Sequence, residues 1–331
     1  MQDTDIMIVN TRPRVLAVRG GALGDFILTL PSLLALCDAG YDVELLTRPA
    51  YGRLAQDAGL IMGWRPLDSP QAALLTVRGA QVGPEWREWL SSFDAVVSWL
   101  PDADGAFQEQ LLQCGVNVFY QGDWRCAGSS PAALQLAEAV SFSRIWVSPV
   151  QNLFSGKPAL ENPSINQIAF HPGSGSPRKN WPLEHWIKVM RWLAEGNPEV
   201  CWLVVTGEVE EQTLPGICSK LDRAGLRWES AHALDLTTLA HRLRQCRVLL
   251  GHDSGIGHLA AACGVACRLL FGPTDPAVWA PLGQHVEVLR AGNLQQLTPD
   301  AVMDWLVTRP VCGLQLTERS VIAGSPPAGC G

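Results

Sequence analysis

The chain has 331 residues, of which 47% are hydrophobic and 17% are charged, and its formal net charge is −7. This length suffices for two domains of ordinary size, and no uncharged apolar run approaches the roughly 18 residues that would indicate a transmembrane helix. The acidic balance and the absence of runs rich in Lys and Arg argue against a nucleic acid partner.

In the first half of the chain, short apolar runs alternate with segments of helical period. The predicted strands are 15–19, 43–47, 95–100 and 116–120, and the predicted helices include 25–37 and 105–114. This alternation is typical of a parallel β-sheet covered by helices. The opening "MQDTDIMIVNTRPR" has acids where a signal peptide has basic residues, so we expect a cytoplasmic protein.

The alternation stops between about 141 and 166, where prolines, asparagines and serines indicate a linker, and then restarts. The predicted strands of the second half are 167–173, 200–207, 248–251 and 267–273, and its predicted helices are 182–195, 236–245, one opening near His258, and 298–308. We therefore predict an α/β protein with domains at 1–155 and 156–312 and a mobile tail at 313–331.

The stretch "RGGALGDFILTLPS" joins the first strand to the first helix. It departs from the dinucleotide pattern G-x-G-x-x-G because Arg19 replaces the first glycine, and a carboxylate there would repel a pyrophosphate. Gly20, Gly21 and Gly24 let a substrate hydroxyl approach Asp25. These residues favour a general acid or base at Asp25; the structural alternative is that Asp25 only caps the helix.

The stretch "HPGSGSPRKNWPLEHW" follows a buried type of strand. Its small residues Gly173, Ser174 and Gly175 offer backbone N–H groups, and Lys179 adds a positive charge, so a diphosphate would fit there. It is not a Walker loop, since G-x-x-x-x-G-K-[ST] is absent. The alternatives are a solvated Lys179 and, for His171, a hydrogen bond to a neighbouring loop.

A third glycine-rich stretch, "GHDSGIGHLAAACGVACRLLFGPTDP", joins two strands through a helix. N–H groups at the start of such a helix bind anions. The candidate ligand-binding residues here are Asp253, Ser254, Gly255, His258, Thr274 and Asp275. The alternatives are helix capping by Asp253 or Ser254, packing of His258, and turn stabilisation by Asp275.

Two weaker features concern a ribose and an acceptor. In "VVTGEVEEQ", Glu208 or Glu210 follows a strand and is placed to hydrogen-bond ribose hydroxyls, although acids also complement a helix dipole there. Gly21 lies in the loop before Asp25, and Arg48 and Arg53 are candidate ligands of an anionic sugar or phosphate; solvated arginines are the alternative.

Cysteine and histidine spacing gives no indication of a metal. Ten cysteines are spread along the chain without a C-x-x-C pair, and none of the seven histidines joins them at a familiar zinc spacing. We predict reduced core thiols, no metal site and no cofactor.

Taken together, these motifs resemble glycosyltransferase family 9, the ADP-heptose:lipopolysaccharide heptosyltransferases. "GDFILTLP" is similar to the family's G-D-x-x-x-x-x-P, "KNWPLEHW" to its K-x-W-P-x-x-x-W, and "DSGIGHLAAACGVACRLLFGPTDP" to its D-[ST]-G-x-x-H-L-x-A-A…G-P-T-D-P block. The resemblance implies a GT-B fold, in which two Rossmann-like domains face each other across a cleft, with the acceptor on the first and the nucleotide sugar on the second.

By matching position, the resemblance implies that Asp25 is the general base and that Lys179 faces the donor diphosphate. It also implies that Asp253, Ser254, Gly255 and His258 belong to the donor loop, with Gly21, Arg48 and Arg53 on the acceptor side. Asp25 would deprotonate an acceptor hydroxyl as it attacks the anomeric carbon opposite the leaving nucleotide, inverting that centre. Lys179 and loop N–H groups would stabilise the leaving diphosphate in place of a metal.

The resulting hypothesis is an inverting transferase that moves heptose from ADP-heptose to a lipopolysaccharide core or related surface glycan acceptor. This acceptor would be a lipid-linked or core oligosaccharide, reached by peripheral contact at the inner face of the inner membrane. The alternatives are a GT-B transferase using another nucleotide sugar, a non-catalytic glycan- or nucleotide-binding module, and, more distantly, a dinucleotide oxidoreductase.

Overall fold

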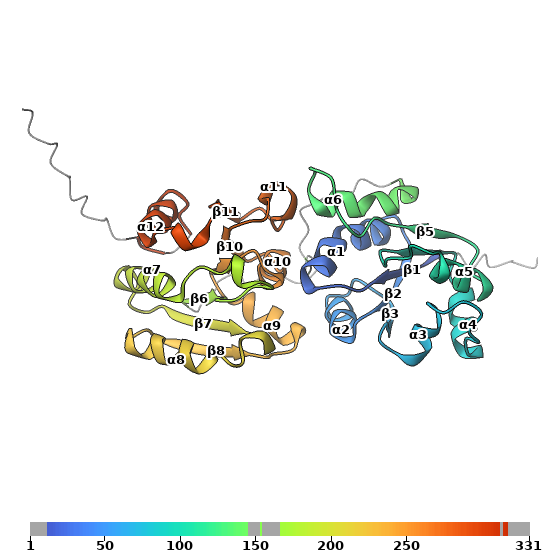
Figure 1. The fold of residues 1–331 in the computed structure, drawn as a ribbon, viewed down its shortest axis with the longest axis horizontal. Coiled ribbons are helices and arrows are strands. Elements are labelled where there is room, and N and C mark those ends of the chain that lie inside the picture. Colours follow the sequence, from blue (N-terminus) through green and yellow to red (C-terminus); the bar gives the residue numbers. More distant parts are fainter. Residues whose placement is uncertain (1–11, 145–152, 154–165, 312–313, 317–331) are drawn as a thin grey trace, which may run out of the picture.

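The computed structural model describes residues 12–144, 153, 166–311 and 314–316, which form two α/β units side by side (Figure 1). The predicted boundary at 155/156 and the predicted tail, apart from 314–316, lie outside the described residues. None of the described helices is long and apolar enough to cross a membrane.

The N-terminal unit contains a five-stranded parallel sheet in the order β3-β2-β1-β4-β5. The strands are β1 (Arg14–Arg19), β2 (Asp42–Thr47), β3 (Gly63–Pro66), β4 (Ala95–Ser98) and β5 (Phe119–Gln121). Its helices are α1 (Leu23–Asp38), α2 (Pro49–Asp57), α3 (Pro70–Leu74), α4 (Pro84–Ser91), α5 (Ala106–Gln113) and α6 (Ala132–Ala137), the last followed by the 3₁₀ turn η1 (Glu138–Ser143).

Strand β1 shows why this sequence forms a central strand. Val15 and Ala17 pack with α1, α2 and α6, whereas Leu16 and Val18 pack with α3, α4 and α5 on the opposite face. All four side chains are fully buried. A strand covered on both faces is apolar throughout, as parallel sheets require.

The C-terminal unit contains a six-stranded parallel sheet in the order β11-β10-β9-β6-β7-β8. The strands are β6 (Gln167–Phe170), β7 (Cys201–Thr206), β8 (Trp228–His232), β9 (Val248–His252), β10 (Ala266–Phe271) and β11 (Val286–Arg290). The helices are α7 (Leu183–Gly196), α8 (Leu214–Arg223), α9 (Leu236–Leu243), α10 (Gly255–Ala262), α11 (Pro276–Trp279) and α12 (Pro299–Thr308), with 3₁₀ turns η2 (Pro177–Lys179), η3 (Glu208–Glu210) and η4 (Leu294–Gln296). This strand order is that of a Rossmann-type sheet, whose ligands bind beyond the carboxyl ends of the strands.

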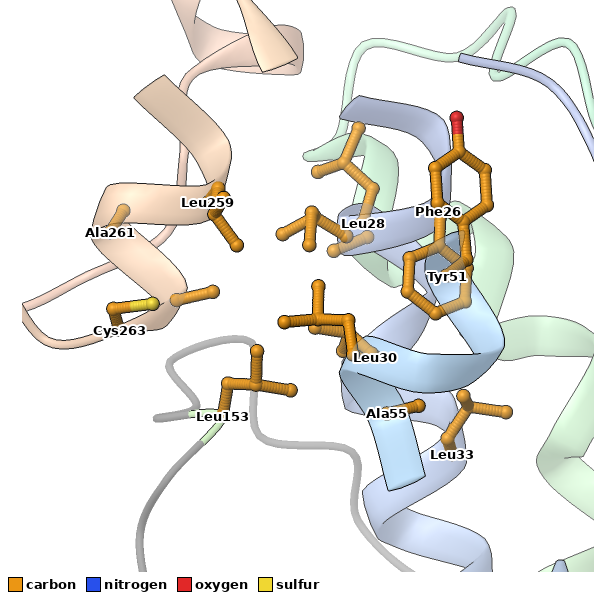
Figure 2. Close-up of a cluster of buried hydrophobic side chains, with 14 of the residues drawn as sticks. Phe26, Leu28, Leu30, Leu33, Tyr51, Ala55, Leu153, Leu259, Ala261 and Cys263 are labelled. Atoms are coloured by element: carbon orange, nitrogen blue, oxygen red, sulfur yellow. The ribbon is translucent and has the colours of Figure 1, made fainter. Parts of the chain in front are cut away.

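The two units share one hydrophobic core through α1 and α10. Figure 2 shows Leu28 and Leu30 of α1 pointing toward Leu259 of α10, with Leu153 beside them. These side chains are at most 6% exposed. The relative position of the units is therefore fixed by apolar packing rather than by a surface contact alone.

The contact between α1 and α10 is closest where both helices begin. A Cβ atom on Gly255 would lie 2.9 Å from the Leu23 Cβ and 3.2 Å from the Gly24 backbone nitrogen. A side chain at position 255 would therefore push the two helix starts apart.

The structure confirms the predicted parallel α/β architecture and corrects several boundaries. Helix α1 begins at Leu23 after the N-cap Ala22, so Asp25 lies in the first turn; it is not the N-cap residue, but its side chain accepts from the N-cap N–H and so takes part in capping. Helix α10 begins at Gly255, earlier than predicted, because the Ser254 side chain caps it by accepting from the Gly257 N–H. The elements that the sequence analysis did not predict include β3, β8, β11, α2, α3, α4, α6 and α8.

Replacing Gly255 by alanine should destabilise the protein by about 1–3 kcal/mol, because the added methyl group overpacks the contact with α1. The matched control is Gly216→Ala in α8, where a Cβ meets nothing within 4 Å. Alanine there should stabilise the protein by roughly 0.5–1 kcal/mol through helix propensity. Urea unfolding of both variants checks this, and equal effects would contradict the close approach of α1 and α10.

Candidate active site

A pocket of about 410 Å³ lies between the two units where several strands end at their carboxyl edges. The start of α1 forms one wall, and loops of the C-terminal unit form the other. Its lining residues are Ala22, Gly24, Asp25, Leu28, Gly175, Lys179, Asp253, Ser254, Gly255, His258, Thr274 and Trp279. We call this the cleft pocket.

The loop before α1 fixes the Asp25 carboxylate. Its Oδ2 accepts a hydrogen bond from the Ala22 N–H at 3.0 Å. Gly21 has φ +87°, and a Cβ there would lie 2.8 Å from the same oxygen. Glycine is favoured at position 21 for two reasons: the backbone is left-handed there, and a side chain would overlap the Asp25 carboxylate.

Two side chains support this loop from beneath, and the sequence analysis assigned neither a supporting role. The buried Arg19 guanidinium donates to the Asp25 backbone carbonyl at 3.2 and 3.3 Å, and the Tyr51 hydroxyl donates to the Gly21 carbonyl at 3.2 Å. Burial lowers the pKa of Arg19, and the nearby Asp25 carboxylate opposes that shift. Tyr51 also stacks on Phe26, with ring centroids 4.7 Å apart.

On the opposite wall, Lys179 and Asp253 form an ion pair. The Lys179 Nζ lies 2.6 Å from the Asp253 Oδ2, and the Thr274 hydroxyl donates to the same oxygen at 2.6 Å. The Asp253 side chain is 8% exposed and that of Lys179 is 27% exposed. The aspartate is thus held by a cation and a hydroxyl, while the ammonium group still borders the pocket.

His258 lies among these charged groups. Burial lowers its pKa to about 4; Asp253 and Asp25 act to raise it, and Lys179 acts to lower it further. The Cβ position of Gly24 lies 3.4 Å from the His258 ring. The neutral imidazole of His258 therefore packs directly against the first turn of α1, which carries Asp25.

The other predicted small residues line a second pocket of about 650 Å³, which we call the outer pocket. It contains Gly173, Ser174 and Glu210, and it shares Gly175 with the cleft pocket. The Glu210 Oε2 accepts from the Gly207 N–H at 2.8 Å, and a Cβ on Gly173 would lie 2.0 Å from the Glu210 Oε1. Only glycine at 173 leaves room for this carboxylate.

The remaining predicted residues line neither pocket. Glu208, Arg48 and Arg53 are exposed, and the Arg48 charge acts on Tyr51 beside the Asp25 loop. The His171 Nδ1 lies 2.8 Å from the Val205 carbonyl, and the Asp275 Oδ1 accepts from the Ala277 N–H and pairs with Arg290. The Asp275 contacts match its structural alternative, whereas the partner of His171 lies in strand β7 and not in a loop; the ligand roles of both residues stay predictions.

The sequence analysis assigned no role to Trp279 or His252. Trp279 lines the cleft pocket, and His252 is the last residue of β9, directly before Asp253. The signal that could have marked His252 is a polar residue at the end of an otherwise apolar strand. Over the described ranges, no group of three or more His, Cys, Asp or Glu residues is placed to hold a metal ion.

Comparison with known proteins identifies the family. The model of glycosyltransferase family 9 (heptosyltransferase) matches residues 134–303. Lipopolysaccharide heptosyltransferase 1 of Pseudomonas aeruginosa is 32% identical over 318 residues, 82% of this chain and 82% of that protein. The chain belongs to glycosyltransferase family 9. Lipopolysaccharide heptosyltransferase 1 of Escherichia coli O18:K1:H7 is 25% identical over 336 residues, 88% of this chain and 97% of that protein.

Solved structures show the fold of this family 9 glycosyltransferase. The E. coli heptosyltransferase WaaC with ADP superposes with a TM-score of 0.70 at 19% identity, covering 90% of this chain and 100% of that one. The two parallel α/β units thus form the GT-B fold that the motifs implied.

Buried neutral histidines should make this glycosyltransferase sensitive to acid. Burial lowers the pKa of His252 to about 3 and that of His258 to about 4, against 6.5 for an ordinary histidine. Below pH 6.5 the unfolded chain therefore binds protons that the folded protein does not. The free energy of unfolding should fall with pH from about 6.5 toward 4, by up to about 1.4 kcal/mol per pH unit per histidine.

Urea unfolding at several pH values between 7.5 and 5 measures this slope. His252→Gln should make it shallower, because one buried group no longer titrates. His285→Gln, at an exposed histidine, should keep the wild-type slope. An unchanged slope in His252→Gln would contradict the assignment of a neutral buried imidazole.

Proposed function

We propose that this glycosyltransferase moves a heptosyl group from ADP-heptose to a lipopolysaccharide core or related lipid-linked oligosaccharide. The observation that carries the proposal is the cleft pocket, which sets the Asp25 carboxylate of one domain opposite the Lys179 ammonium group of the other. Two relatives are named lipopolysaccharide heptosyltransferase 1, and structures of WaaC hold ADP and ADP-2-deoxy-2-fluoro heptose.

The environments of two aspartates support different roles for them. Asp253 is almost fully buried and bonded to Lys179 and Thr274, so its charge is used to orient the lysine. Within the described chain, the Asp25 side chain has one hydrogen bond, from a backbone N–H, and borders the pocket. Two carboxylates in such different surroundings take different parts in a reaction.

In this proposal Asp25 accepts the proton of an acceptor hydroxyl. The hydroxyl oxygen forms a bond to the anomeric carbon while the bond to the donor diphosphate breaks, and ADP leaves with that electron pair. Attack from the α1 side and departure toward Lys179 place the two groups on opposite faces, which inverts the centre. Lys179 and the first-turn N–H groups of α10 stabilise the charge that develops on the diphosphate.

The donor would extend from Gly175 toward the outer pocket. Gly175 borders both pockets, so a diphosphate there would have its nucleoside near Ser174 and Glu210. The Glu210 carboxylate is oriented by the Gly207 N–H and suits a ribose hydroxyl. The acceptor would approach from the N-terminal domain beside Gly21, with Arg48 and Arg53 as contacts for its anionic groups. We place the reaction on the cytoplasmic side, with peripheral contact at the membrane that carries the acceptor.

Nucleotide binding tests the donor assignment. In a thermal-shift panel of ADP, ADP-heptose, UDP, GDP, CMP and NAD, ADP and ADP-heptose should raise the melting temperature most, because they bind the native state. Lys179→Ala should lose this stabilisation, whereas Lys188→Ala, at an exposed lysine of α7, should keep it. If UDP or GDP raises the melting temperature instead, the donor is another nucleotide sugar. If no nucleotide raises it, a glycan-binding module is favoured.

Replacing Asp25 by asparagine tests the base. Asparagine keeps an oxygen for the Ala22 N–H but cannot take a proton, so kcat should fall by about 10²- to 10⁴-fold while ADP binding is retained. The control Asp38→Asn, at the exposed far end of the same helix, should retain wild-type kcat. Transfer assays with ADP-heptose measure both. Activity of Asp25→Asn within tenfold of wild type would exclude general-base catalysis by Asp25.

A further inference from the structure

His252 is a fully buried side chain at the end of β9. Its Nε2 accepts hydrogen bonds from the Trp181 backbone N–H at 2.8 Å and from the Trp186 indole N–H at 3.1 Å. A ring nitrogen that accepts has no proton, so the imidazole is neutral and carries its proton on Nδ1. One buried acceptor thus serves two donors from another segment.

Both donors belong to the segment that carries Lys179. Trp181 lies two residues after Lys179, and Trp186 lies in the first turn of α7. The ring of Trp186 packs edge-on against those of Trp181 and His252, with centroids 5.0 and 5.5 Å apart. The segment is also fastened at Leu297, whose carbonyl accepts from the Trp181 indole N–H at 2.9 Å.

His252 and Asp253, which are adjacent at the end of β9, therefore hold the Lys179 segment at two points. His252 holds the backbone at Trp181, and Asp253 holds the Lys179 ammonium group at 2.6 Å. If His252 became apolar, the buried Trp181 N–H would have no acceptor there, which is costly inside a protein. The segment would then shift to find another partner, and the lysine would shift with it.

We propose that His252 is a positioning residue of the donor site, which fixes Lys179 by serving as the acceptor for Trp181 and Trp186. The inference rests on the proposed function, because it assigns Lys179 to the donor. His252 does not touch the reacting atoms; it acts through the backbone of the lysine segment.

The first test is amide exchange, which does not depend on any substrate. His252→Leu should accelerate exchange in the peptide covering 174–181 by about tenfold or more, because the Trp181 N–H loses its acceptor. His252→Gln offers an oxygen in place of Nε2 and should stay much closer to wild type. Exchange that is unchanged in His252→Leu overturns the inference whatever the enzyme's donor is.

The second test is a kinetic separation of donor from acceptor. His252→Leu should raise the donor KM by about tenfold and lower kcat, leave the acceptor KM unchanged, and be largely rescued in His252→Gln. In Lys179→Ala, the same leucine substitution should add little, because the group that it displaces is already absent. Fully additive losses, or an equal loss in the glutamine variant, would overturn the inference.

A matched tryptophan pair keeps the test decisive if His252→Leu fails to fold. Trp186 and Trp202 are both buried in the core of the C-terminal domain, but within the described chain the Trp202 indole nitrogen has no hydrogen-bond partner. Trp186→Phe removes the second donor to His252, so exchange at the start of α7 should accelerate and the donor KM should rise, whereas Trp202→Phe should change neither. Equal behaviour of the two variants contradicts the role of His252.

The outcomes also separate this inference from the proposed function. If amide exchange follows the expected order but wild-type protein uses no ADP-heptose, the proposed donor is wrong, and His252 still fixes the segment that carries Lys179. If wild-type protein transfers heptose but His252→Leu keeps its donor KM, the proposed function stands and His252 is not a positioning residue of the donor site.

Discussion

The contact between the first turns of α1 and α10 is the constraint on which the rest of the structure depends. Gly24 and Gly255 bring two backbones so close that a Cβ on Gly255 would meet the Gly24 nitrogen at 3.2 Å. The shared core of Leu28, Leu30 and Leu259 holds this approach from one side. Because the loop of Gly21 leads into α1 and the loop of Asp253 leads into α10, the same packing that joins the domains also sets the width of the cleft pocket.

The buried polar groups of the site are stabilised in three different ways. Arg19 is buried against backbone carbonyls, Asp253 is buried against a lysine and a hydroxyl, and His252 is buried in its neutral form. The contacts of Arg19 and Asp253 satisfy charges that would otherwise be costly to remove from water, and the His252 Nε2 satisfies two buried N–H donors. Asp25 differs, because it is only partly buried and keeps contact with the pocket.

Much of the fold was predictable from the sequence, because buried parallel strands such as "VLAV" are apolar throughout and are followed by amphipathic helices. The missed strands β3 and β11 lie at sheet edges, where partly exposed residues such as those of "GWRP" and "VEVLR" give a weak pattern. The motifs located Asp25, Lys179 and Asp253, and the resemblance implied that their two domains face each other, but the ion pair between Lys179 and Asp253 joins residues far apart in sequence and was not predictable from the motifs. The roles of Tyr51 and His252 were equally hidden, since each acts on a backbone group distant in sequence.

The two walls of the cleft pocket differ in how many hydrogen bonds and ion pairs hold them. The wall formed by the C-terminal domain is built by loops that follow β6, β9 and β10, which are neighbours in one sheet. Contacts of Lys179 and Thr274 with Asp253, and of Trp181 with His252, hold these loops together. The opposite wall has one such loop, supported by Arg19 and Tyr51, beside the exposed Arg48 and Arg53. A diphosphate needs fixed charges in a fixed geometry, whereas exposed arginines suit an acceptor that is large and arrives from solution or a membrane surface. The difference in burial between the two walls therefore matches the difference between the two substrates that the proposed reaction requires.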